Sequence, residues 1–202
     1  MTNEMFDEAL KNVQNGDWLA VHINENAKNV MDFLGVNIEN LSGPFAHIEQ
    51  IIDKDKDITF TAQPPKLCYE KLSRYRGQPG VEIYFLRLIG VTPEQVSAMA
   101  VTAKGLIGVN YNIGLDADLA ARYSTYQIPI LGYFIRKFHY KDPMPNKLDL
   151  KGAGIVCSSA ASIVARSVRP EFLAEFKDVQ TITPSIFFDA DELDIVARCV
   201  EN

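Results

Sequence analysis

The sequence has little of what metal centres, disulfide-rich scaffolds and nucleic-acid-binding proteins require. Its 202 residues include only three cysteines (Cys68, Cys157 and Cys199) and three histidines, and no two cysteines are spaced as C-x-x-C. We therefore expect no metal site, and we expect reduced thiols. The formal net charge of −6 argues against a basic surface for nucleic acid, so no nucleic-acid partner is expected.

Long apolar runs and a leader segment are also missing. The run "IPILGYFI" (128–135) is among the longest and is far shorter than the ~20 residues of a membrane-spanning helix. The N-terminal "MTNEMFDEALKN" has no hydrophobic segment typical of a secretion signal. These features predict no membrane span and, by default, a cytoplasmic protein. Delivery as a phage virion or secretion-system component is the alternative.

Apolar residues make up 47% of the chain and charged residues 23%, which is typical of an ordinary globular protein. The length favours a single domain over residues 1–202, with a possible lid or insertion at 111–150. Strands are expected at 17–23, 45–52, 58–63 and 81–89. Helices are expected at 3–14, from Pro93 to near Gly105 or Gly108, from Cys157 to about Val168, at 170–176 and within 183–199. Strands early and helices late favour an α+β fold.

Two of these strands form a hairpin with a polar face. If residues 53–57 are the loop, Ile52 pairs with Ile58, His47 lies opposite Gln63, and Glu49 lies opposite Thr61. Such a face is often simply the solvated side of a sheet. The alternative is functional, because a histidine that acts as a base needs a polar partner to orient it. Gln63 is the best-placed partner, and Glu49 or Thr61 would serve if the register slipped by two residues.

Cys157 stands where an apolar run meets a series of small residues, in "IVCSSAASIVARS" (155–167). A thiol in the first turn of a helix feels the positive end of the helix dipole, which favours the thiolate. A buried packing cysteine is the alternative, since free cysteine is among the most buried residue types. Cys68 and Cys199 have no comparable setting and are interpreted as structural thiols.

Taken in order, these pieces resemble the circularly permuted branch of the NlpC-type papain-like cysteine hydrolases, the YiiX-like group. The segments that carry the resemblance are "NGDWLAVH" (15–22), "SGPFAHIEQII" (42–52), "ITFTAQPP" (58–65), "YEKLSRYRGQPGVEIYFLRL" (69–88), "GLIGVNYN" (105–112), "IVCSSAASIVARS" (155–167) and "TITPSIFFDADEL" (181–193). The histidine precedes the cysteine, which is the permuted order. The sequence departs from the pattern at Thr61, where relatives often have an acidic residue, and at Ala46, where they often have serine.

The resemblance implies an antiparallel sheet packed against the nucleophile helix, in a permuted papain-like α+β fold. Cys157 matches the nucleophile and His47 the general base. Gln63 is the expected third residue, with Glu49 and Thr61 as alternatives. The mechanism that it implies needs no metal and no organic cofactor.

Three functions follow from this resemblance. The first is a peptidase or amidase that acts on peptidoglycan stem peptides. The second is an acyl or lipid amide-ester hydrolase, or an acyltransferase, of the same fold. The third is a catalytically silent structural or virion-associated module. The expected partner is accordingly a peptide or acyl substrate, and the side chains expected to line its site are Trp18, His22, Ser158 and Tyr111.

Overall fold

A six-stranded sheet forms the centre of the protein. The computed structural model describes residues 1–23, 45–112 and 155–200, and it orders the strands β4-β3-β2-β1-β5-β6, with every neighbouring pair antiparallel. The strands are β1 (Trp18–Ile23), β2 (His47–Asp53), β3 (Ile58–Gln63), β4 (Lys66–Lys71), β5 (Val81–Leu88) and β6 (Leu193–Cys199). With the helices that cover it, this sheet confirms the predicted α+β class.

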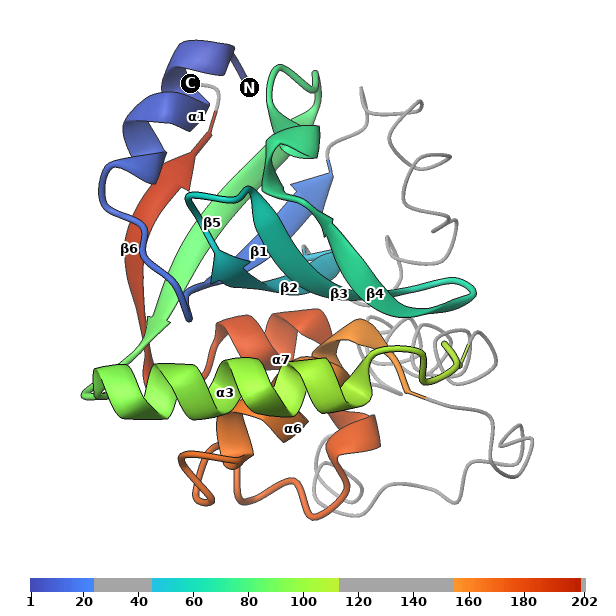
Figure 1. The fold of residues 1–202 in the computed structure, drawn as a ribbon. Helices are drawn as coiled ribbons and strands as arrows, with labels where there is room; N and C mark the ends of the chain where they lie inside the picture. Colours follow the sequence, from blue (N-terminus) through green and yellow to red (C-terminus); the bar gives the residue numbers. More distant parts are fainter. Residues whose placement is uncertain (24–44, 113–154, 201–202) are drawn as a thin grey trace, which may run out of the picture.

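Helices lie on both faces of the sheet, because successive side chains along a strand point into two different cores (Figure 1). The described helices are α1 (Asn3–Leu10), α3 (Pro93–Leu106), α6 (Cys157–Arg166) and α7 (Pro184–Phe188), with 3₁₀ segments η2 (Leu72–Tyr75) and η3 (Val179–Thr181). On β1, Trp18 and Ala20 pack into the core shared with α3, α6 and α7. Leu19 and Val21 point the other way, into the core shared with α1 and η2. We call these the α6-side core and the α1-side core.

The helix that follows β5 confirms its sequence prediction at the N-terminus. The Thr92 side chain accepts a hydrogen bond from the Gln95 backbone N–H, and the Gln95 side chain accepts one from the Thr92 N–H. Pro93 occupies the first helical position, where its missing N–H costs nothing. Met99 and Ala103 then bury one stripe of α3 in the α6-side core.

The C-terminal helical prediction for 183–199 is wrong beyond Phe188. Helix α7 ends there, and Leu193–Cys199 forms β6, which pairs with β5 at the edge of the sheet. The β-branched pair Ile195 and Val196 favours a strand, and an edge strand buries too little of either face to show a clear period in the sequence.

Residues 170–176, also predicted as helix, form turns instead. Leu173 has a φ of +47°, which interrupts a right-handed helix. The Arg166 side chain donates to the carbonyls of Phe172, Leu173 and Phe176, so these acceptors are satisfied without helical bonds.

Strand β4 had no sequence prediction, and its alternation of buried and exposed residues is weak.

The proposed lid or insertion at 111–150 lies outside the described residues, apart from Tyr111 and Asn112. Within the described ranges, no helix has the length and apolar character needed to cross a membrane.

Gly16 closes the turn that leads into β1. Its φ of +89° lies in the region that favours glycine, and its N–H donates to the Ile51 carbonyl at 2.8 Å. A β-carbon at this position would lie 2.8 Å from Cγ1 of Val96 on α3. The turn, β2 and α3 therefore meet at a point where a side chain has no room.

Gly16→Ala is expected to lower the free energy of unfolding by about 1–3 kcal/mol, through backbone strain and the clash with Val96. Gly105→Ala is the matched control, because an added β-carbon there meets nothing within 4 Å and the residue lies in α3. That variant is expected to gain up to about 1 kcal/mol. Urea unfolding of both proteins measures the difference, and equal stabilities would contradict this account of Gly16.

Candidate active site

The polar face of the β2–β3 hairpin is buried. His47 is 2% exposed, Glu49 and Thr59 are 0% exposed, and Thr61 is 1% exposed. The interpretation of this face as an ordinary solvated surface is therefore wrong. A polar cluster without water needs internal partners for its hydrogen-bonding groups.

The register of this hairpin matches the prediction near His47 and departs from it near the loop. Glu49 pairs with Thr61, as expected, but Ile58 pairs with Asp53 in place of Ile52. A β-bulge between Ile51 and Asp53 causes the shift, since it adds one residue to β2. The bulge lies at the loop end of the hairpin, so the polar pairs keep their places.

The imidazole of His47 contacts both alternative partners without any slip of register. Its Nε2 lies 2.7 Å from Thr61 Oγ1 and 3.2 Å from Glu49 Oε1. Gln63, the partner first expected, directs its amide elsewhere: Nε2 donates to Glu70 at 2.9 Å, and Oε1 accepts from Arg74. Gln63 is the last residue of β3, so its side chain reaches β4 and η2.

Glu49 is the centre of this cluster. Its carboxylate accepts from the Tyr75 hydroxyl at 2.7 Å and from the Thr59 hydroxyl at 2.9 Å, and it forms an ion pair with Arg74. The Arg74 guanidinium lies 5.0 Å from the centre of the Tyr75 ring. A buried carboxylate is tolerated when it is paired and hydrogen-bonded in this way.

Arg74 and Tyr75 come from η2, and sequence reasoning missed both. Asp57, in the β2–β3 turn, holds this segment in place by accepting from the Ser73 backbone N–H at 2.7 Å and from its hydroxyl. One signal was available: a lone glutamate among the apolar residues of "FAHIEQII" requires a cation, and "SRYR" is a nearby source of arginine.

Cys157 is the first residue of α6, as predicted. Val156 occupies the N-cap and provides no side-chain bond to the first turn. The thiol is 4% exposed and belongs to the α6-side core. Backbone N–H groups at such a helix start stabilise a thiolate or another developing negative charge.

The start of α6 is tied to the turn between β3 and β4. The Tyr111 N–H donates to the Pro65 carbonyl at 2.9 Å, and Tyr111 forms a parallel bridge with Ile155. Helix α6 also packs against β2 and β3. Because β3 ends at Gln63 beside the start of β2, His47 and Cys157 lie at the same end of the sheet.

The two residues nevertheless belong to different sides of the sheet. Val21 and Leu19, the strand partners of His47 and Glu49, belong to the α1-side core. Cys157 belongs to the α6-side core.

The structure spreads the four expected substrate-binding residues over several environments. Trp18 is fully buried, with its ring 5.2 Å from that of Phe187. His22 is partly exposed and lies 3.1 Å from Glu82. The Ser158 hydroxyl donates to the Ile182 carbonyl, and Tyr111 is 8% exposed beside the start of α6.

The other two cysteines have settings that keep their thiols protonated. Burial raises the pKa of Cys199 to about 11. Burial, followed by the nearby Glu70 carboxylate, raises the pKa of Cys68. Both findings agree with their interpretation as structural thiols.

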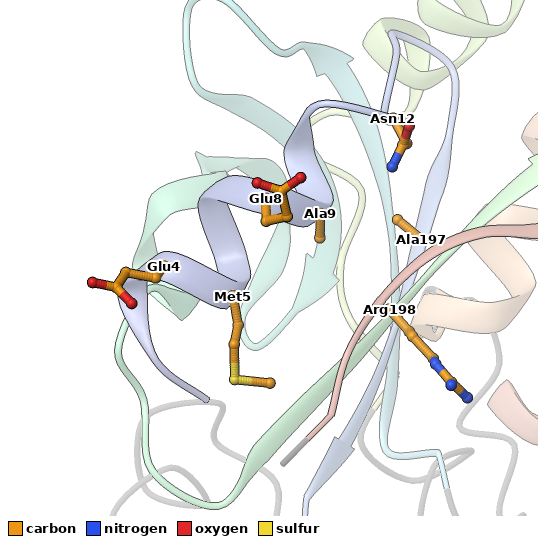
Figure 2. A pocket seen from close by; sticks show the side chains of 7 residues that line it. All are labelled: Glu4, Met5, Glu8, Ala9, Asn12, Ala197 and Arg198. Atoms are coloured by element: carbon orange, nitrogen blue, oxygen red, sulfur yellow. The ribbon is translucent and has the colours of Figure 1, made fainter. Parts of the chain in front are cut away.

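A separate hollow of about 500 Å³ lies between α1 and β6 (Figure 2). Its polar lining consists of Glu4, Glu8, Asn12 and Arg198. Neither Cys157 nor His47 lies among its lining residues. In the part of the chain that the structure describes, no cluster of three or more histidine, cysteine or acidic side chains is arranged to hold a metal ion.

The chain was compared with known families, curated proteins and solved structures. No known family matches the sequence, and no curated protein matches it. Among solved structures, the chain is similar to the metalloprotein yiiX from Escherichia coli O157:H7, with a TM-score of 0.47 and 15% sequence identity. That alignment covers 93% of this chain and 98% of the yiiX chain.

Glu49→Ala is expected to lower the free energy of unfolding by about 3–5 kcal/mol, because it leaves the Arg74 charge buried without its carboxylate. Asp53→Ala, in the same strand, is the matched control. Asp53 pairs with Lys56, whose side chain is 75% exposed, so its loss should leave the unfolding midpoint unchanged. Urea denaturation compares the two variants, and similar effects would contradict a buried, stabilised pair.

Proposed function

We propose that this protein is a cysteine hydrolase that cleaves amide bonds, with Cys157 as nucleophile and His47 as general base. One observation carries the proposal: a buried imidazole, held by a carboxylate and a hydroxyl, lies at the end of the sheet where α6 begins with a thiol. A nucleophile, a base and a group that orients the base are the parts such chemistry needs. The order of motifs along the sequence supports the same reaction.

The contacts of His47 assign a role to each ring nitrogen. With Nε2 donating to Glu49 or Thr61, Nδ1 carries the lone pair. Nδ1 then takes the proton of the Cys157 thiol, and the thiolate attacks the amide carbonyl. Backbone N–H groups in the first turn of α6 stabilise the oxyanion, an effect of about 3 kcal/mol per donor.

The tetrahedral intermediate breaks its C–N bond, and the imidazolium returns the proton to the leaving amine. The product of this half-reaction is a thioacyl-enzyme. Water, activated by the same imidazole, then releases the acid and regenerates the thiol. The substrate class that we propose is the stem peptide of peptidoglycan, and the alternative within the same chemistry is an acyl ester.

A catalytically silent module is the second candidate. The observation that favours it is the burial of Cys157, which is 4% exposed and belongs to the α6-side core. In such a module the Glu49 cluster stabilises the fold, and Cys157 is a packing residue at a helix start.

Cys157→Ala separates these functions. If the thiol is the nucleophile, this variant should lose hydrolysis of purified sacculi by at least ~10³-fold, measured as newly released peptide amines. Cys68→Ala is the matched control and should keep the wild-type rate, because Cys68 lies on β4 outside the proposed dyad.

Hydrolysis of acyl esters without release of amines from sacculi would instead support the acyl substrate. An unchanged rate in a folded Cys157→Ala protein would contradict the proposed nucleophile. A wild-type protein that hydrolyses neither substrate would support the silent module.

A further inference from the structure

The proposed mechanism leaves the buried cation Arg74 without a role. Its side chain is 8% exposed and forms ion pairs with Glu49 and, at 3.6 Å, with Glu70. A charge of this kind is costly to bury, and one carboxylate beside His47 would be sufficient to orient the ring. The presence of the arginine therefore needs an explanation of its own.

We infer that Arg74 is a positioning residue for His47. Its guanidinium neutralises the Glu49 carboxylate, so that one nitrogen of the imidazole remains unprotonated and can act as a base. This inference rests on the proposed function for its catalytic meaning. Arg74 touches Glu49, and Glu49 touches His47, so the effect is transmitted through the carboxylate.

The charges around His47 support this assignment. Glu49 on β2 contacts the imidazole directly, and Glu70 on β4 lies one contact further away, against Arg74. Tyr75 on η2 donates to Glu49 as a neutral hydroxyl, and Val21 on β1 faces His47 as an apolar side chain. Arg74 supplies the positive charge on the Glu49 carboxylate.

Without that cation, a desolvated carboxylate would hold the imidazole as imidazolium. Attraction between opposite charges about 3 Å apart is strong away from water, so the histidine would keep its proton over the pH range in which a base has to accept one. With the Arg74 guanidinium on the same carboxylate, Glu49 still orients Nε2 of His47. The ion pair offsets the negative charge of Glu49, so the carboxylate attracts the ring proton less strongly. Arginine suits this role because it stays charged at every accessible pH.

The position of Arg74 is fixed in advance. The Asp57 carboxylate binds Ser73, the residue before Arg74, through both its backbone N–H and its hydroxyl. The Tyr75 hydroxyl and the guanidinium meet at the same oxygen of Glu49. The guanidinium is thus held by contacts to Glu49, Glu70 and Gln63.

The test is a pH titration of the histidine ring signals by NMR in the intact protein, which needs no substrate. In Arg74→Gln, the titration midpoint of His47 should move upward by about one pH unit or more. Arg74→Lys is the matched control, and it should keep the midpoint within a few tenths of a unit of the wild type.

An unchanged midpoint for His47 in folded Arg74→Gln would overturn the inference, and so would equal shifts in the Gln and Lys variants. If Arg74→Gln fails to fold, Tyr75→Phe decides instead, because it removes one donor from Glu49 and keeps the ring. Its His47 midpoint should rise by a smaller amount, and no rise would overturn the inference. These outcomes are independent of hydrolysis, so an inert Cys157 would refute the proposed function alone.

Discussion

A carboxylate buried in the middle of a sheet is the constraint on which the rest of this structure depends. Glu49 has no exposure to water, so every oxygen lone pair has to be matched from within the protein. Thr59 supplies a hydroxyl from the next strand, and η2 folds over the sheet to bring Tyr75 and Arg74. His47 completes the set, and its ring orientation is thereby fixed.

The second constraint comes from the opposite side of the sheet. The small residues of α6 allow it to pack closely on β2 and β3, and its serine hydroxyls bind the carbonyls of Val179 and Ile182. The helix start is bound to the β3–β4 turn through Tyr111 and Ile155. The thiol and the imidazole are thus each held by the elements around them at one end of the sheet. Both candidate functions share this fold and differ in whether the thiol acts as a nucleophile.

The sequence predicted local features well and tertiary ones poorly. The hairpin, the pairing of Glu49 with Thr61, the capped start of α3 and the start of α6 at Cys157 all depend on residues close together in the chain. Strand β6 was predicted as helix, because half-exposed edge strands show no decisive period. The bulge at Ile51–Asp53 could not be foreseen, since either loop length satisfies the alternation. Arg74 reaches Glu49 across 25 residues, so the segment "SRYR" offered a source of arginine but no local pattern specified that Arg74 pairs with Glu49.

The most direct test of a thiol activated by His47 is the rate at which Cys157 reacts with iodoacetamide between pH 5 and 9, read by mass spectrometry for each cysteine. Cys199 is the internal control, because its pKa of about 11 keeps it protonated over this range. The account predicts that, near pH 6, Cys157 reacts at least ~10-fold faster than Cys68 and Cys199. In His47→Ala, Cys157 should lose this advantage over the other two cysteines. A Cys157 that is inert, or that titrates near 8.5 like an ordinary thiol with or without His47, would contradict it.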